Sequence, residues 1–96
     1  MVIFKELKIN DDEKLCYIKN KAIKLTKSEY NILNFLLNNC NKIFSREELI
    51  EKAWPEPVSI RAVDTAMSRL RKKLGEYGKH IITRLGFGYG FKKNID

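Results

Sequence analysis

The chain has 96 residues, of which 44% are hydrophobic and 32% charged, and 19 lysines and arginines outnumber 12 aspartates and glutamates, giving a net charge of +7. This length suffices for one small core and excludes an enzyme built of two lobes. No apolar run approaches the ~20 residues of a membrane span, and the N-terminus lacks the layout of a secretory signal, so we expect a cytoplasmic protein without membrane contact.

The positive charge is concentrated in the C-terminal two-fifths of the chain. Residues 1–59 carry ten cations and nine anions, whereas residues 60–96 carry nine cations and three anions, a net charge of +6. Such an asymmetry attracts an acidic partner, most often nucleic acid and otherwise an anionic membrane surface. From charge alone, a basic face that only solubilises the protein is an equally good interpretation.

Potential metal ligands and nucleophiles are few and scattered. Cys16 and Cys40 are far apart, form no CxxC pattern and have only His80 as a nitrogen ligand. We therefore predict no metal site, no disulfide and no cofactor, with both cysteines buried as small hydrophobic residues. His80 is expected to lead into a strand. Because no Asp, Glu, His or Cys cluster suits acid–base or nucleophilic chemistry, we predict no catalytic residues and no enzyme activity.

The N-terminal half predicts strands followed by two capped helices. Alternating apolar residues, broken by polar turns, indicate three strands at about 7–9, 16–18 and 23–25. Thr26 to Glu29 and Ser45 to Glu48 are capping boxes, each of which starts a helix. The first helix carries the apolar stripe Ile32, Leu33, Leu36, Leu37 and Cys40. The second helix ends near Trp54, because Pro55 has no amide to donate, and residues 55–59 form an exposed loop.

Residues 60–74 predict a helix with two opposed faces. At ~100° per residue, one arc holds Val63, Met67, Leu70 and Leu74, and the other holds Arg61, Thr65, Ser68, Arg69 and Lys72. Cations neutralise phosphates, and a guanidinium beside a hydroxyl can also reach base edges. Gly75 and Gly78 mark the end of the helix. This pattern indicates DNA binding.

The C-terminal segment predicts a β-hairpin over residues 81–91. Helix, loop, helix and hairpin is the layout of a winged helix, whose last helix enters the major groove while the hairpin covers an adjacent groove. Gly86, Gly88 and Gly90 let the tip turn sharply and approach a backbone closely, and positive charge comes from Arg84, Lys92 and Lys93. The sequence thus predicts one α+β domain over residues 1–96, a winged helix-turn-helix with an N-terminal antiparallel sheet, three helices and a C-terminal wing.

Three ordered motifs resemble the C-terminal effector domain of OmpR/PhoB-type response regulators. They are Ser45-Arg-Glu-Glu-Leu49 with Trp54, the helix from Arg61 to Leu74, and Gly86-Phe-Gly-Tyr-Gly-Phe91. The resemblance covers nearly the whole chain and implies a four-stranded N-terminal sheet and sequence-specific binding of double-stranded DNA by a transcription regulator. It also implies a two-component phosphorelay, in which an N-terminal receiver domain accepts phosphate from a sensor histidine kinase. Since the receiver is absent from this chain, we expect either the effector domain of a longer protein or a stand-alone member regulated in another way.

By position, the resemblance also assigns individual contacts. Base edges are assigned to Thr65, Ser68 and Arg69, and phosphates to Arg61, Arg71, Lys72 and Thr83. Arg69 is the best candidate for direct readout, because its fork can donate to both major-groove acceptors of guanine. Ala66 is expected to meet either a thymine methyl or the edge of the core. Asp64, on the same side as Arg71, is expected to orient a partner rather than touch DNA.

The wing departs from the pattern of the family. Many members place a basic residue directly before the first wing glycine, where this chain has Leu85, with Arg84 one position earlier. Because strand side chains alternate between faces, this shift affects which residue enters the minor groove, to which Arg84 is assigned. Phe87 is expected to pack within the turn or, if exposed, to touch a sugar.

The resemblance further places a contact with RNA polymerase in the loop, at Glu56 and Val58, although a plain connector is at least as good an interpretation. The isolated domain is expected to be a monomer that dimerises head to tail on direct-repeat half-sites. The alternative to base-specific DNA binding is a basic interaction module that binds RNA or an acidic protein without reading bases.

Overall fold

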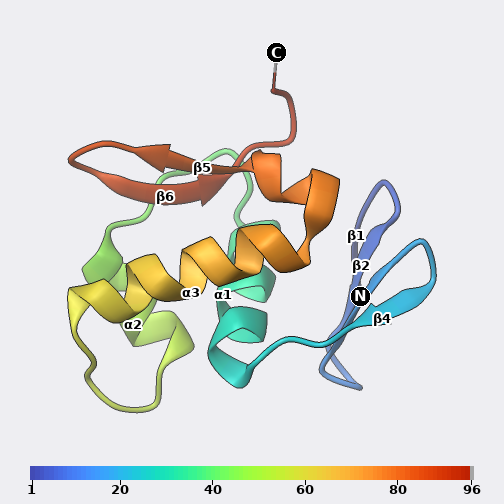
Figure 1. Ribbon diagram of the computed structural model, residues 1–96, viewed down its shortest axis with the longest axis horizontal. Helices are drawn as coiled ribbons and strands as arrows, with labels where there is room; N and C mark the ends of the chain where they lie inside the picture. Colours follow the sequence, from blue (N-terminus) through green and yellow to red (C-terminus); the bar gives the residue numbers. More distant parts are fainter. Residues whose placement is uncertain (96) are drawn as a thin grey trace.

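The computed structural model describes residues 1–95, which form a sheet, three α-helices and a C-terminal hairpin in chain order (Figure 1). The N-terminal sheet lies at one end of the helices, and the hairpin lies alongside the last helix (Figure 1). The elements are β1 Val2–Phe4, β2 Leu7–Asn10, β3 Leu15–Ile18, β4 Lys21–Ile23, α1 Lys27–Asn38, α2 Arg46–Ala53, α3 Ile60–Lys73, the 3-10 helix η1 Gly75–His80, β5 Ile81–Arg84 and β6 Gly88–Phe91.

The N-terminal sheet is an antiparallel meander in the order β1-β2-β3-β4. Leu7 and Ile9 of β2, with Cys16 of β3, are buried on one face, as the period of two requires. The four strands match the number implied by the resemblance. The sequence pattern alone missed β1, which has three residues and buries only Phe4, and it placed the last strand about two residues late.

Both predicted capping boxes are confirmed. The Thr26 hydroxyl accepts from the Glu29 amide at 3.2 Å, and the Glu29 carboxylate accepts from the Thr26 amide at 2.9 Å. Ser45 and Glu48 make the same pair of bonds at 3.1 and 2.9 Å. These bonds satisfy backbone donors that a helix N-terminus leaves free, so the starts of α1 and α2 are fixed locally.

An ion pair with a buried carboxylate, which the sequence did not reveal, joins the start of α1 to the end of α3. The Glu29 side chain is 2% exposed, and Lys73 Nζ lies 2.6 Å from its carboxylate. Burial by itself raises the pKa of Glu29, but the hydrogen bonds from Lys73 and Thr26 outweigh it, and the pKa is lowered overall. The capping residue of α1 therefore also holds the last turn of α3.

The end of α3 is where the glycines predicted it, but a turn of 3-10 helix follows that was not foreseen. Gly75 has φ +58°, the left-handed conformation typical of a helix end. In η1, the Tyr77 hydroxyl accepts from the Glu6 amide at 3.1 Å and so ties this turn to the sheet. His80 is buried, stacks on Phe91 and directly precedes β5, as expected.

The hairpin packs on the loop between α1 and α2. Phe44 and Tyr89 exchange two backbone hydrogen bonds, at 2.8 and 3.0 Å, and the Asn41 amide donates to the Phe91 carbonyl at 2.8 Å. A Cβ at Gly88 or Gly90 would overlap the carbonyl oxygen of Phe44 or Lys42. The backbone that these glycines approach closely is therefore the chain's own.

Candidate nucleic-acid interface

The two predicted faces of α3 are confirmed. Val63, Met67 and Leu70 are 0% exposed and Leu74 is 1% exposed, so the apolar face lies in the core. The opposite face reaches solvent along the whole helix, through Arg61, Thr65, Ser68, Arg69 and Lys72. A helix held by its buried side presents these cations and hydroxyls on a rigid support, which is the arrangement that groove recognition needs.

The exposed face of α3 borders an open depression with a volume of about 430 Å³. Its walls come from three separate segments, namely the start of α1, the end of α2 and residues 61–69 of α3. The residues that matter here are Thr26, Ser28, Trp54, Arg61, Thr65 and Arg69. The sequence analysis did not assign the first three to the site. Thr26 and Ser28 lie far from α3 in the chain, and Trp54 precedes it by a loop, so only the packing of α1 and α2 brings them beside it.

Ala66 lies at the edge of the core. It is 8% exposed, and it lines the same depression as Thr65 and Arg69. Of the two roles expected for it, the structure therefore supports the packing role.

Asp64 is an orienting residue, as expected, and its hydrogen-bond partners are Arg46 of α2 and Tyr89 of β6. Arg46 Nε donates to the Asp64 carboxylate at 2.8 Å, and the Tyr89 hydroxyl donates to the same oxygen. The hydrogen bond from Tyr89, and after it the one from Arg46, lowers the pKa of Asp64. Burial raises the pKa of Tyr89, and the hydrogen bond to Asp64 raises it further. Asp64 therefore orients Arg46 and Tyr89, because α3 turns it toward α2 and β6.

Arg71 reaches the hairpin. Its Nε donates to the Ile81 carbonyl at 3.0 Å, its Nη2 donates to the Thr83 hydroxyl at 2.7 Å, and its guanidinium lies 5.7 Å from the centre of the Tyr89 ring. Two residues predicted to contact phosphates, Arg71 and Thr83, are thus hydrogen-bonded to each other. No local sequence pattern indicates this contact, because the two partners belong to elements that meet only in the folded chain.

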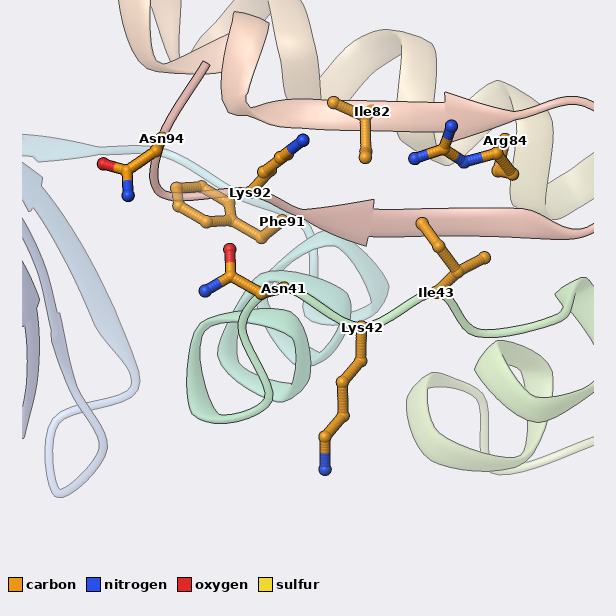
Figure 2. Close-up of a pocket in the computed structure, with 8 residues that line it drawn as sticks. All are labelled: Asn41, Lys42, Ile43, Ile82, Arg84, Phe91, Lys92 and Asn94. Atoms are coloured by element: carbon orange, nitrogen blue, oxygen red, sulfur yellow. The ribbon is translucent and has the colours of Figure 1, made fainter.

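Arg84 lies on the other face of β5 from Thr83. Figure 2 shows Arg84 and Ile82 on one side of this strand, where they border a cavity of about 280 Å³ together with Asn41 and Lys92. Arg84 is exposed and pairs with Gly88 across the hairpin. The alternation of strand side chains therefore separates Arg84 from the Arg71–Thr83 contact.

The tip of the wing carries two exposed apolar side chains, with Leu85 90% and Phe87 72% exposed. The expectation that Phe87 packs within the turn is wrong. The turn is closed by the backbone, because the Phe87 amide donates to the Arg84 carbonyl at 2.9 Å and Gly86 adopts φ +83°. No side-chain packing is needed to hold it.

The remaining candidate positions fall in ordinary surroundings. In the loop from Pro55 to Ser59, Glu56 is exposed and Val58 half-buried. Cys16 is buried and its burial raises the pKa of the thiol to about 11, whereas Cys40 is only half-buried, so the expectation of burial holds for Cys16 alone.

Residues 1–95 hold neither a helix that could span a membrane nor a cluster of metal ligands. The helices described there are too short or too polar to span a lipid bilayer. Over the same residues, no three His, Cys, Asp or Glu side chains gather closely enough to share a metal ion.

An exposed basic helix supported by two further helices and flanked by a β-hairpin defines a winged helix-turn-helix. The family model described as "Transcriptional regulatory protein, C terminal" matches residues 20–91. The chain therefore belongs to this family, the C-terminal domains of OmpR/PhoB-type regulators.

Individual relatives agree with this assignment. The transcriptional regulatory protein SrrA of Staphylococcus aureus is 36% identical over an alignment 98 positions long, which covers 96% of this chain and 41% of SrrA. The response regulator DrrB of Thermotoga maritima, an OmpR/PhoB homologue, superposes with a TM-score of 0.83 at 40% identity, over 94% of this chain and 43% of DrrB. The DNA-binding domain of the response regulator AdeR, solved in complex with an intercistronic region, superposes with a TM-score of 0.85 at 33% identity, over 96% of this chain and 98% of that domain. The chain thus spans about two-fifths of the length of SrrA.

Proposed function

We propose that this chain is the DNA-binding effector domain of a two-component response regulator and controls transcription by binding specific double-stranded sites. The observation that carries the proposal is the exposed polar face of α3, where Thr65, Ser68 and Arg69 project from a helix whose other face is fully buried. The relative AdeR, whose DNA-binding domain was solved with an intercistronic region, has the same fold. In this assignment the chain acts by binding and not by catalysis.

In the proposed complex, α3 lies in the major groove. Arg69 donates both arms of its guanidinium to a guanine, a pairing that discriminates by about 1–3 kcal/mol, and Thr65 and Ser68 meet neighbouring base edges. Arg61 and Lys72, at the two ends of the exposed face, bind phosphates. The depression beside α3 receives one strand of the duplex, since its walls carry the hydroxyl side chains of Thr26 and Ser28.

The hairpin over residues 81–91 lies over the adjacent minor groove. Arg84 supplies its cationic contact, and the exposed tip residues Leu85 and Phe87 meet the sugars that line the groove. Thr83 is less suited to a phosphate than the sequence suggested, because its hydroxyl already accepts from Arg71.

The wider assembly follows from the family. The isolated domain is a monomer that forms head-to-tail dimers on direct-repeat half-sites, and Glu56 and Val58 face RNA polymerase. In the whole protein, an N-terminal receiver domain takes its signal from a sensor histidine kinase, and the regulator works in the cytoplasm, where the chromosome lies.

The test is selection of bound duplexes from a random library by the purified chain, followed by affinity measurements at several salt concentrations. We expect one enriched sequence, bound at least ~1000-fold more tightly than its scrambled duplex. The affinity for each of the two duplexes should fall steeply as the salt concentration rises. Equal affinity for the enriched duplex, its scrambled version and an RNA of the same length would instead support the basic interaction module.

A further inference from the structure

A set of polar side chains connects α3 to the wing. The Tyr89 side chain, on β6, is 5% exposed, and two guanidinium groups flank its ring, Arg46 at 5.8 Å and Arg71 at 5.7 Å from the centroid. Its hydroxyl donates to Asp64. Arg71 also donates to Ile81 and Thr83 of β5, so both strands of the hairpin are tied to the helix. We call Asp64, Arg71, Thr83 and Tyr89, with Arg46, the wing clamp.

We propose that Arg71 is a positioning residue, which holds the wing at a fixed angle to α3 through the wing clamp, and that it does not bind phosphate. This inference rests on the proposed DNA-binding function and changes the role that the sequence suggested for Arg71. It also makes Tyr89 the residue that joins the wing to the exposed helix.

The geometry of Arg71 supports this role. Two donors of its guanidinium point at β5, with N–O distances of 3.0 and 2.7 Å, and one face of the group covers the Tyr89 ring. A planar fork can satisfy a carbonyl, a hydroxyl and an aromatic face together, which an ammonium group on a flexible stem does not do. The contacts with Ile81 and Thr83 use two of the five N–H donors of the guanidinium and turn the group toward β5. Lys72, the next residue, is exposed and is the better placed of the two for a phosphate.

Apart from the wing clamp, the hairpin is held by backbone bonds to a loop and by the end of β6 in the core, where Phe91 packs on Phe4 and His80. The backbone bonds between Phe44 and Tyr89 join β6 to the segment between α1 and α2, not to α3. The wing clamp joins both strands of the hairpin directly to α3, so without it we expect the wing to tilt more freely relative to the helix that enters the major groove. Ordering a loose wing on DNA costs affinity, whereas a wing already held by the clamp avoids that cost.

The experiment compares four variants on the duplex selected above. Arg71→Lys keeps the charge and loses the fork, so we expect it to weaken binding by roughly 10-fold, as Arg71→Ala does, with the salt slope of each close to that of the wild type. Lys72→Ala, the control for a phosphate contact, should reduce the salt slope by ~1. Tyr89→Phe, which removes the hydroxyl bond to Asp64, should weaken binding in the same way as Arg71→Lys. Wild-type affinity for Arg71→Lys, with a slope reduced by ~1 in Arg71→Ala, would overturn the proposal.

A second measurement needs no DNA. In Arg71→Lys and Tyr89→Phe, amide hydrogen exchange should be faster along β5 and β6 and unchanged in α1. Tyr77→Phe is the matched control, because it removes the hydroxyl of another buried tyrosine, which accepts from Glu6 in the turn between β1 and β2. It should leave the exchange of the hairpin amides unchanged. Unchanged exchange in the hairpin of both clamp variants would also overturn the proposal. If the wild type selects no duplex, the proposed function fails, while exchange still decides whether the clamp holds the wing.

Discussion

Replacing Gly88 by alanine tests how the wing is attached to the body of the domain. Gly88 has φ +143°, and an added Cβ would overlap the Phe44 carbonyl oxygen. Gly86, two residues earlier, also has a positive φ, +83°, but nothing lies within 4 Å of a Cβ there. Both substitutions therefore force alanine into an unfavourable φ, but only Gly88→Ala also produces a steric overlap with the Phe44 carbonyl oxygen.

The difference between the two variants can be estimated from the contacts. The unfavourable φ costs about 1–2 kcal/mol at either position. At Gly88, relief of the overlap also separates β6 from the loop and breaks the two backbone bonds between Phe44 and Tyr89, at about 0.5–1.5 kcal/mol each. We therefore expect Gly86→Ala to lower the free energy of unfolding by about 1–2 kcal/mol and Gly88→Ala by about 2–5 kcal/mol.

Urea unfolding followed by circular dichroism measures both variants against the wild type. The fluorescence of Trp54, the one tryptophan of the chain, provides a second probe of the same transition. Equal losses in the two variants, or a smaller loss in Gly88→Ala, would refute the argument that β6 is held by close backbone contact with the loop.

Two further predictions concern the core and the ion pair between Glu29 and Lys73. Leu70→Ala should lower the free energy of unfolding by about 2–5 kcal/mol, because Leu70 is 0% exposed, and a near-neutral change in melting would mean that α3 does not bury this face. The pKa of Glu29 is lowered from its ordinary value of 4.5, so its ion pair with Lys73 stabilises the fold above about pH 4.5, and this stability is lost as the pH falls through the folded-state pKa. Glu29→Gln should therefore be less stable than the wild type at pH 7. Between pH 5 and pH 3 the variant should lose less stability than the wild type does, and parallel curves of stability against pH for the two proteins over that range would contradict the assignment.

Local signals in the sequence predicted much of the fold. The capping boxes at Thr26 and Ser45 depend on side chains three residues apart, and the buried face of α3 depends on a period of 3.6, so both are visible without the tertiary structure. The short strand β1 and the turn η1 lack such signals. Their stability comes from packing, for example from the contact between the Phe4 and Tyr77 rings at 6.1 Å.

The candidate site shows the same division. The exposure of Arg69 follows from its place on α3, and the sequence predicted it. The role of Arg71 did not follow, because its bonds to Ile81 and Thr83 exist only when the hairpin folds back on the helix. A helical wheel puts Arg71 near the cationic face, but it does not show the strand beside it.

The most direct test of the central claim, that the exposed face of α3 reads bases, is the affinity of Arg69→Ala for the selected duplex and for a scrambled duplex of equal length. We predict a loss of roughly 5- to 150-fold on the selected duplex, equivalent to about 1–3 kcal/mol, and a much smaller loss on the scrambled one. Arg61→Ala, which removes an exposed charge from the same helix, is the matched control and should weaken both duplexes alike. Equal losses on the two duplexes for Arg69→Ala would contradict base readout by this helix face.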